Sequence, residues 1–332
     1  MTAPLPSVAT PLAEDEAEAA FALMLDGEVA DEDIARFLVA LSERGETAAE
    51  IAGAARAMRA RVIPIRAPAN AIDVCGTGGD GMHTLNVSTA VALVVAACGV
   101  PVAKHGNRAA SSKAGAADTL EALGLNLDRA VETAEATLAD IGICFLFAAR
   151  HHPALGRLMP LRKRLGRRTI FNLMGPLANP AGVRRQLIGI ARPAYVPIYA
   201  EALVRLGSEH SLIVSGDEGL DELSLAGGNE VAVVRDGRFA MQRVSPADAG
   251  LPTAPVDAIR GDDAAYNAAA LRRLLLGEHG PYRDAVLFNA AGALIVAGDV
   301  TRWRDGVEEA AEAIDKGLAN TLLDCWIAAN NT

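Results

Sequence analysis

Cysteine is scarce in this sequence, with four residues among 332. They stand far apart, at Cys75, Cys98, Cys144 and Cys325, and no two of them form a C-x-x-C pair. Three of them lie in apolar stretches, where a free thiol behaves as a small hydrophobic side chain. We therefore expect reduced thiols, mostly in the core, as is usual for a cytoplasmic protein.

A long hydrophobic run is also missing. The longest apolar stretch, residues 90–103, contains a glycine and a proline and is too short to cross a bilayer. The beginning of the chain lacks a basic start and becomes acidic early. We therefore expect no signal peptide, no membrane partner and a cytoplasmic location.

Positive charge is in deficit. The 31 lysines and arginines face 41 aspartates and glutamates, which leaves a formal net charge of −10. Such a surface argues against non-specific binding to nucleic acid or to anionic membranes, but a local basic pocket could still take a phosphorylated metabolite. With 51% hydrophobic and 22% charged residues, the composition is that of a globular protein.

Three short helical patterns open the chain. The first covers residues 14–25, the second follows Asp31, and the third follows a capping box that starts at Thr47. Prolines then interrupt the pattern. The sequence predicts a small all-helical domain over residues 1–70 and a second, larger domain over residues 71–332.

Short apolar strand patterns alternate with helical ones in the larger domain. This alternation predicts an α/β fold whose central sheet is mostly parallel. A hairpin that turns at Asp236-Gly237 adds an antiparallel part. The expected strands are residues 71–75, 100–105, 143–148, 211–216 and 285–290, and the hairpin covers residues 230–244.

The first of these strands leads into the loop GTGGDGMHTLNVST, residues 76–89. Its first six residues match G-x-G-x-x-G, a dinucleotide-binding pattern in which the turn leads straight into a helix. Here helical character starts only near Ser88 and Thr89. No acidic strand end follows about 20 residues later, where a ribose partner would stand. Lys104 and His105 occupy that region, so the loop is unsuited to a nicotinamide or flavin nucleotide.

The loop still suits another anion. Its glycines allow backbone N–H groups to approach a phosphate, and Asn86, Ser88 and Thr89 add donors at the start of a helix. By itself it fits a capped glycine-rich turn equally well. The second loop, KHGNRAASSK at residues 104–113, is also rich in phosphate donors. Because both loops follow strands of one sheet, we expect them to converge on a ligand with more than one phosphate.

Two further segments carry charge of the kind that such a site needs. Asp221 and Glu222 follow the strand at residues 211–216, and paired carboxylates beside a phosphate suit Mg²⁺. Taken alone, that acidic loop fits solvated surface better than a metal site, since acidic surface loops are common. Arg162 lies in the basic segment after His152, where its guanidinium could pair with a substrate carboxylate.

Together these segments resemble the anthranilate phosphoribosyltransferase family of the tryptophan pathway, within the nucleoside phosphorylase and phosphoribosyltransferase-like proteins. The matching pieces occur in the family's order between about residues 71 and 298. They are GTGGDG with TLNVSTA, KHGNRAASSKAGAADTLEALG, HPAL with PLRKRLGRRTIFNLMGPLANP, GLDELS, and NAAGALIVAG. The N-terminal helices fit the family's layout as well.

The resemblance implies the transfer of a phosphoribosyl group from 5-phosphoribosyl-1-pyrophosphate (PRPP) to the amine of anthranilate, with release of pyrophosphate. It also implies a homodimer, two Mg²⁺ per subunit, and a site at the hinge between the domains. The helical domain would include part of the segment around residues 160–190.

The resemblance also implies roles for individual residues. Lys104, Asn107 and Arg162 would position the substrates, and no strong general base is apparent. Anthranilate would meet Gly76, His105, Asn107, His152 and Arg162, and the metal would meet Ser88, Asp221 and Glu222. PRPP would meet Gly76, Gly79, Asp80, Thr84, Asn86, Ser88, Thr89, Lys104, Asn107, Arg108, Ser111 and Ser112.

The sequence departs from the family pattern in the second loop. Ala114 and Ala116 stand where serines are usual, so two hydroxyl donors for the pyrophosphate are absent.

Three other interpretations compete with this family resemblance. A related transferase with another acceptor or a nucleic-acid ligand fits poorly with the acidic charge and the intact KHGNR motif. A pyrimidine-nucleoside phosphorylase would carry a different loop after Lys104. A scaffold without activity would not explain donors, acids and Arg162 in matching order.

Overall fold

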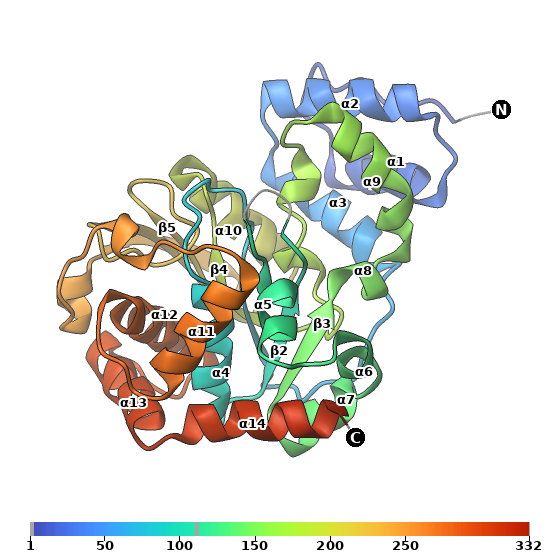
Figure 1. The fold of residues 1–332 in the computed structure, drawn as a ribbon. Helices are drawn as coiled ribbons and strands as arrows, with labels where there is room; N and C mark the ends of the chain where they lie inside the picture. The colour runs from blue at the N-terminus through green and yellow to red at the C-terminus, as the bar shows by residue number, and fades with distance from the viewer. Residues whose placement is uncertain (1–2, 110–112, 332) are drawn as a thin grey trace.

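The computed structural model describes residues 3–109 and 113–331. A small unit of helices lies at one end of a larger α/β unit, and the chain starts in the small unit and ends in the large one (Figure 1). Ser111 and Ser112, expected at the PRPP site, lie outside the described residues. Among the described residues, no helix combines the length and the apolar character needed to span a membrane.

The small unit confirms the three predicted N-terminal helices. The capping box is present, since Thr47 Oγ1 accepts from the Glu50 N–H at 3.3 Å and Glu50 Oε2 accepts from the Thr47 N–H at 2.9 Å. A fourth helix, distant in sequence, packs on the first two through the buried Leu158 and Leu161. The helices are α1 (Glu14–Asp26), α2 (Asp31–Arg44), α3 (Ala48–Arg59) and α9 (Pro153–Leu165).

The large unit is built on a seven-stranded sheet within the described residues, in the order β3-β2-β1-β4-β5-β6-β7. The first five strands pair in parallel, and β6 and β7 are antiparallel. This arrangement confirms the predicted mostly parallel sheet with an added hairpin. The strands are β1 (Ile72–Gly76), β2 (Val102–Gly106), β3 (Ile143–Phe147), β4 (Arg185–Gly189), β5 (His210–Gly216), β6 (Asn229–Arg235) and β7 (Arg238–Val244).

The hairpin turns where the sequence predicts. Asp236 and Gly237 both have positive φ, 53° and 70°, which is the backbone of a type I′ turn. Glycine and aspartate tolerate that conformation, and its twist matches the twist of the two strands that it joins. The Asp-Gly dipeptide between two apolar runs is therefore sufficient to specify the turn.

One predicted strand is wrong and one strand was not predicted. Residues 285–290 lie inside α12 (Pro281–Ala297), which is buried on nearly every side. A helix buried all round has no polar face, so a short piece of it has the same apolar pattern as a buried strand. The strand that was not predicted from the sequence, β4, follows a turn-rich segment and contributes five residues between β1 and β5.

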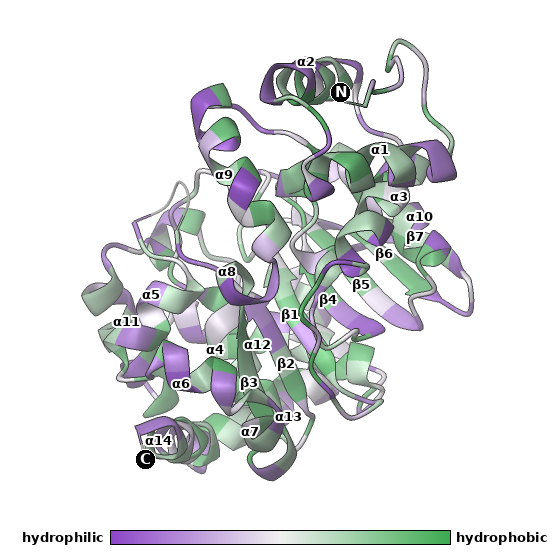
Figure 2. Cartoon of the chain, turned by 90° about the vertical axis from the view of Figure 1, so that its right-hand side faces the viewer, coloured by the Kyte–Doolittle hydropathy of each residue, from purple (hydrophilic) through white to green (hydrophobic). Residues whose placement is uncertain are grey.

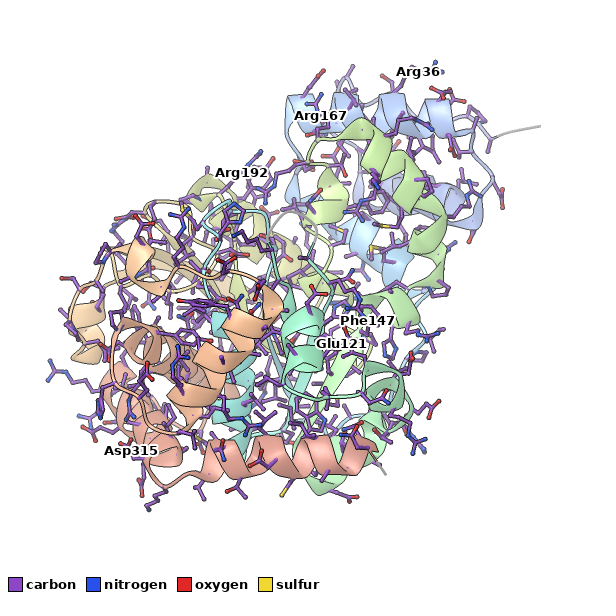
Figure 3. The ribbon with its side chains drawn as sticks, in the orientation of Figure 1. Arg36, Glu121, Phe147, Arg167, Arg192 and Asp315 are labelled. Atoms are coloured by element: carbon purple, nitrogen blue, oxygen red, sulfur yellow. The ribbon has the colours of Figure 1, made fainter. Side chains whose placement is uncertain are left out.

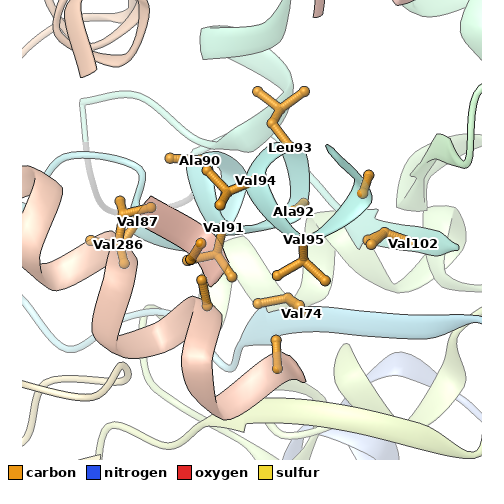
Figure 4. Packing of buried hydrophobic residues seen from close by; sticks show 14 of the residues in the cluster. Val74, Val87, Ala90, Val91, Ala92, Leu93, Val94, Val95, Val102 and Val286 are labelled. Atoms are coloured by element: carbon orange, nitrogen blue, oxygen red, sulfur yellow. The ribbon is translucent and has the colours of Figure 1, made fainter. Parts of the chain in front are cut away.

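Helices cover both faces of the sheet. On one face α4 (Val87–Ala97) and α12 form the main core, where Val91 and Val95 pack with Val74 of β1 (Figure 4). On the other face α10 (Val196–Arg205) joins α3, so the helical unit and the sheet share a second core. The remaining helices are α5 (Ala116–Ala122), α6 (Leu127–Glu132), α7 (Ala134–Asp140), α8 (Ala148–His151), α11 (Ala264–Leu275), α13 (Trp303–Asp315) and α14 (Leu318–Asn331).

This arrangement leaves one edge for a ligand. Helix α9 shows hydrophilic and hydrophobic residues together in Figure 2, as expected for a helix with a single buried face. The loops after β1 and β2 start next to each other because those strands are parallel neighbours. The carboxyl ends of these strands therefore face the segments that connect the sheet to α9.

Candidate active site

A cavity of about 400 Å³ opens at the carboxyl ends of β1 and β2. Its wall also includes α9 and the loop after β5, so segments far apart in sequence meet there. The predicted residues that line it are Gly76, Gly79, Asp80, Thr84, Asn86, Ser88, Lys104, His105, Asn107, Arg108, His152, Arg162, Asp221 and Glu222. Thr89 is not among the lining residues; it lies buried in the first turn of α4.

The glycine-rich loop is as long as the sequence suggests. Helix α4 begins at Val87, one residue before the predicted start, so several residues separate Gly81 from the helix. Gly78 and Gly79 have φ of 70° and 71°, a conformation that costs other residues free energy. At Gly76 a Cβ atom would lie 2.3 Å from Asp221 Oδ2. Backbone therefore approaches the acidic loop where a side chain would not fit.

Asp221 and Glu222 both turn back to the first loop. Asp221 Oδ2 accepts from the Gly78 N–H at 2.6 Å, and Glu222 Oε1 accepts from the Ser88 N–H at 3.1 Å. Burial, followed by the nearby charge of Asp80, raises the pKa of Asp221 to about 7. Burial and the charge of Asp221 raise the pKa of Glu222 to about 8. A bound cation would reduce the repulsion between these crowded carboxylates and favour their charged forms.

These groups fit a magnesium ion that shares its coordination with a substrate. Asp221, Glu222 and the Ser88 hydroxyl are hard oxygen donors, which Mg²⁺ prefers. In the described part of the chain, no three histidine, cysteine or acidic side chains form a complete metal cluster. Phosphate oxygens of a ligand would therefore have to complete the coordination, as is usual for Mg²⁺ bound with phosphates.

Lys104 brings a positive charge under the first loop. Its side chain is 2% exposed, and Nζ donates to the Val74 carbonyl at 2.7 Å and to Ser88 Oγ at 3.3 Å. The ammonium also lies in the field of Glu222 and of the buried Asp73, and it opposes the upward pKa shift of both carboxyl groups. Lys104 therefore balances negative charge within the floor of the site.

Two histidines form one wall of the cavity. His105 and His152 are each 5% exposed, and their ring centroids lie 5.1 Å apart. His105 Nδ1 lies 2.9 Å from the Gly175 carbonyl, and the His152 ring donates to the Ala178 carbonyl. A carbonyl only accepts, so the ring nitrogen that contacts it carries the proton. For His105 this nitrogen is Nδ1. For His152 it is also Nδ1, because Nε2 has no hydrogen-bond partner among the described residues.

Both rings are therefore hydrogen-bond acceptors at Nε2. Burial lowers the pKa of His105 to about 4. Burial lowers the pKa of His152 to about 3, and repulsion from the neighbouring His105 ring, were both rings protonated, lowers it further. Both Nε2 atoms are buried and have no hydrogen-bond partner among residues 3–109 and 113–331. A buried acceptor without a partner costs free energy, so this wall suits a ligand that brings N–H or O–H donors.

Arg162 brings a positive charge to the wall of the same cavity. It projects from α9, its guanidinium lies 5.6 Å from the centre of the Phe171 ring, and Nη1 contacts Met159 Sδ at 3.8 Å. No carboxylate lies within 4.0 Å of it among residues 3–109 and 113–331. Burial lowers the pKa of Arg162. A partly buried guanidinium without an acid partner is well suited to a ligand carboxylate.

Comparison with known proteins agrees with this site. The family model described as "Glycosyl transferase family, a/b domain" matches residues 68–320, and the helical bundle domain of the same family matches residues 9–62. The chain is 81% identical to the anthranilate phosphoribosyltransferase of Novosphingobium aromaticivorans over 325 residues, 98% of each chain. The enzyme of that name from Sphingopyxis alaskensis is 73% identical over the same shares.

The chain belongs to the anthranilate phosphoribosyltransferase family.

Solved structures of the anthranilate phosphoribosyltransferase family share the whole fold. The enzyme from Thermus thermophilus superposes with a TM-score of 0.91 at 44% identity and covers 98% of both chains. A Saccharomyces cerevisiae enzyme in complex with PRPP and Mg has a TM-score of 0.87 at 29% identity, covering 96% of this chain and 94% of that one. The small helical unit and the mostly parallel sheet are thus features of this family.

Some residues that the family resemblance assigned to PRPP have protein partners in this structure. The Arg108 guanidinium pairs with Asp118 and Glu121 of α5 and lies over the Phe147 ring, and Figure 3 shows Glu121 and Phe147 close together. Asn86 Oδ1 accepts from Thr119 Oγ1 at 2.6 Å and from Asn267 Nδ2 at 2.9 Å. Their contact with PRPP therefore stays a prediction that requires these side chains to exchange or share partners.

Sequence reasoning missed the buried Asp73 in β1. Its carboxylate accepts from Asn179 Nδ2 at 2.8 Å and from the His105 N–H at 3.1 Å. Burial raises the pKa of Asp73, and the Lys104 charge opposes that shift. The signal was present, since one acidic residue stands in the apolar strand pattern at residues 71–75. Its partner Asn179 belongs to the GPLANP motif, more than a hundred residues away.

The GPLANP segment has a clear role in the wall of the site. Four consecutive carbonyls, from Gly175 to Ala178, accept hydrogen bonds from side chains on four different parts of the fold. The donors, in that order, are His105, Gln186, Arg59 and His152. The segment therefore orients both histidines and ties them to the sheet and to α3.

Proposed function

We propose that this chain transfers the phosphoribosyl group of PRPP to the amine of anthranilate, giving N-(5-phosphoribosyl)anthranilate and pyrophosphate in tryptophan biosynthesis. The observation that carries the proposal is the pairing of two unlike halves in one cavity. One half has two neutral histidines and Arg162, which pairs with no acid in the part of the chain that the structure describes. The other half has the glycine-rich loop, Lys104 and the acidic pair. Such a cavity suits an aromatic carboxylate with an amine next to a phosphorylated sugar.

Arg162 is the proposed partner of the anthranilate carboxylate. The amine then lies against the wall that His105 and His152 form. Gly76 and Asn107 line the space between this wall and the first loop. A Saccharomyces cerevisiae enzyme with a TM-score of 0.86 and 27% identity has been solved with 4-fluoroanthranilate, which supports a site of this kind in the fold.

PRPP is the proposed ligand of the two loops. Backbone N–H groups of Gly76 and Gly79, with the side chains that end β1 and begin α4, would approach its phosphates and ribose. The proposed contacts from those segments and from the second loop are Asp80, Thr84, Asn86, Ser88, Thr89, Lys104, Asn107, Arg108, Ser111 and Ser112. Ala114 and Ala116 line the cavity without a hydroxyl, so backbone groups have to serve there.

Two Mg²⁺ per subunit are proposed for the oxygen donors of Ser88, Asp221 and Glu222. When bound, Mg²⁺ would neutralise charge on the pyrophosphate leaving group. Asp221 and Glu222 would hold it with the phosphates, and Lys104 would keep the floor of the site neutral. These residues thereby favour departure of pyrophosphate without a strong general acid.

The bond changes need little acid–base chemistry from the protein. The amine nitrogen is neutral at pH 7 and attacks C1 of the ribose as the bond from C1 to the pyrophosphate oxygen breaks. The bonding electrons leave with pyrophosphate, and the nitrogen gives up one proton afterwards. Pyrophosphate is a stronger base than either buried histidine and can carry that proton away. The chain's task is to hold the amine in line with C1 and exclude water.

Loss of anthranilate fluorescence tests the proposal directly. We expect the signal to fall when the purified protein, PRPP and MgCl₂ are all present, and to stay constant when PRPP is omitted or EDTA is added. No turnover with all three present would refute the proposed reaction. Thymidine with inorganic phosphate serves as a control, because a pyrimidine-nucleoside phosphorylase would release thymine.

We further propose the wider setting of the enzyme. The chain would lie in the cytoplasm, which the four free cysteines support. It would form a homodimer, which the half-exposed Ile63 and Met159 at the helical end support. The domains would be residues 1–70 and 71–332. Part of the segment around residues 160–190 would join the first, and the packing of α9 on α1 and α2 supports this and extends the joined segment back to Pro153. Sedimentation velocity measures the proposed dimer.

A further inference from the structure

Arg168 joins the helical unit to the glycine-rich loop. It follows Gly166, the residue that ends α9, and its guanidinium donates to the Gly78 carbonyl. Its own carbonyl accepts from Ser42 Oγ of α2 at 3.1 Å. One residue therefore contacts, through two different groups, an element of the helical unit and the loop that follows β1.

The glycine-rich loop is held from both sides at Gly78. The N–H of Gly78 donates to Asp221 Oδ2 at 2.6 Å, while its carbonyl accepts from Arg168. Gly78 and Gly79 both have left-handed φ, and a Cβ at Gly79 would lie 2.6 Å from Arg168 Nη2. The course of the loop toward Asp80 thus depends on a carboxylate on one side and a guanidinium on the other.

The charge of Arg168 also acts on the acidic side of the site. Asp80 and Asp221 lie close enough to raise the pKa of Arg168, although burial and the neighbouring Arg192 lower it more. In the described residues, no carboxylate lies within 4.0 Å of Arg168. The guanidinium therefore bonds the backbone of the loop instead of pairing with an acid.

We propose that Arg168 is a positioning residue that sets the conformation of loop 76–84 for Mg²⁺-PRPP and couples that loop to the helical unit. This inference rests on the proposed function for the identity of the ligand only. Because Arg168 is attached to the end of α9 and to α2, any change in the angle between the two units moves it relative to Gly78. Because the Gly79 backbone packs closely against the guanidinium, such a movement of Arg168 would displace the loop as well.

Steady-state kinetics of Arg168→Met and Arg168→Lys test the proposal. We expect Arg168→Met to raise KM for PRPP about tenfold or more, because a charged hydrogen bond to the loop is lost. KM for anthranilate should stay within about twofold, since Arg162 and the histidine wall are untouched. Arg168→Lys keeps the charge and one donor, and should recover part of the PRPP effect. Equal rises in both Michaelis constants would overturn the proposal.

Arg167→Met is the matched control. Arg167 is the preceding residue, pairs with Glu43 at 2.9 Å, and lies on the surface of the helical unit in Figure 3. We expect its variant to keep both Michaelis constants unchanged. A PRPP effect as large as that of Arg168→Met would show that general loss of positive charge, and not the contact with Gly78, is responsible, and would overturn the proposal.

Backbone amide exchange tests the same contact without any activity. In the ligand-free protein, we expect peptides that cover residues 76–84 to exchange faster in Arg168→Met than in Arg167→Met, while peptides of α4 are unchanged. Equal exchange in the two variants would overturn the proposal even if the kinetics agreed. If the wild-type protein transferred nothing to anthranilate, the proposed function would fail, and the exchange result would still decide the role of Arg168. Arg168→Gln replaces Arg168→Met if the latter does not fold.

Discussion

Arg162 is a partly buried arginine that forms no ion pair within the described residues. It lies on α9 beside Phe171. An arginine in that state carries a cost of desolvation without a compensating ion pair. A ligand carboxylate can supply the missing partner, and it does so in the plane of the guanidinium.

We expect Arg162→Met to raise KM for anthranilate about tenfold to a hundredfold and to change KM for PRPP little. The reason is the loss of one charged hydrogen-bond pair, which contributes about 1.5–3 kcal/mol. Initial rates from anthranilate fluorescence measure both constants. Arg164→Met is the control, because Arg164 lies on the same helix but is exposed and paired with Glu32 at 3.6 Å. Unchanged anthranilate saturation would show that another group holds the carboxylate.

His105 and His152 make the stability of the fold depend on pH. Burial lowers the pKa of His105 to about 4 and the pKa of His152 to about 3, from an ordinary value of 6.5. The unfolded chain therefore takes up protons below about pH 6.5, while the folded chain stays neutral at these rings until about pH 4. Their contribution to stability is complete above pH 6.5 and is lost as the pH falls toward their folded pKa values.

We expect the free energy of unfolding to fall between pH 6.5 and pH 4 more steeply in the wild-type protein than in His152→Gln. Each pKa unit of difference corresponds to about 1.4 kcal/mol. Urea unfolding at several pH values measures the slope. His279→Gln, which removes an exposed histidine, should keep the wild-type slope. If His152→Gln kept it as well, the ring would not be buried in its neutral form.

At the scale of elements, the segment from Gly175 to Ala181 holds the site wall together. Its carbonyls fix both histidine rings, and Asn179 bonds to Asp73 at 2.8 Å and to the Ala103 carbonyl at 2.9 Å. Asn179 thus fastens the segment to β1 and β2 near the starts of those strands, below the wall of the cavity. Asp73 is fully buried, and loss of a donor leaves its carboxylate short of a partner.

We expect Asn179→Ala to lower the free energy of unfolding by about 2–4 kcal/mol, since it removes two buried hydrogen bonds, one of them to a carboxylate. Urea unfolding compares it with Asn320→Ala, whose side chain bonds to Arg272 and Asp324 at the surface and whose loss should cost well under about 1 kcal/mol. Similar values for the two variants would mean that the segment is held by packing alone.

At the scale of the whole molecule, the loops after β1 and β2 and the acidic loop after β5 come together only when the sheet is complete. Strand β4 separates β1 from β5, yet Asp221 still reaches Gly78 because the loop after β5 folds back over the end of the strand. At Gly189 of β4 a Cβ would lie 1.5 Å from the Asp221 carbonyl oxygen, so the return of that loop requires glycine there. Ligand binding across these loops should therefore stabilise the entire fold.

We expect PRPP with MgCl₂ to raise the melting temperature by several degrees, because a ligand at about a hundred times its Kd adds about 2.7 kcal/mol to the native state. Differential scanning calorimetry should show no such shift with EDTA, nor in Asp221→Asn combined with Glu222→Gln. Asp236→Asn, at the hairpin turn, is the charge control and should behave as the wild type. A shift of equal size in the double variant would contradict the proposal that Asp221 and Glu222 hold Mg²⁺.

Some of this architecture was readable in the sequence because the signal is local. Thr47 with Glu50, Asp236 with Gly237, and the late start of α4 each depend on neighbours in the chain, and each was confirmed. The strand β4 and the helical state of residues 285–290 were not, because burial on all sides removes the periodicity that separates strand from helix.

The site divides in the same way. The sequence by itself determined which residue types could meet phosphate, metal and carboxylate, since Lys104, Asp221 and Arg162 each stand in a recognisable motif. Only the tertiary structure decided that Arg108 pairs with α5, that Arg168 holds Gly78, and that both histidines are neutral acceptors. The reason is that hydrogen-bond partners, burial and pKa depend on segments that are often far apart in the chain, and only packing brings those segments into contact.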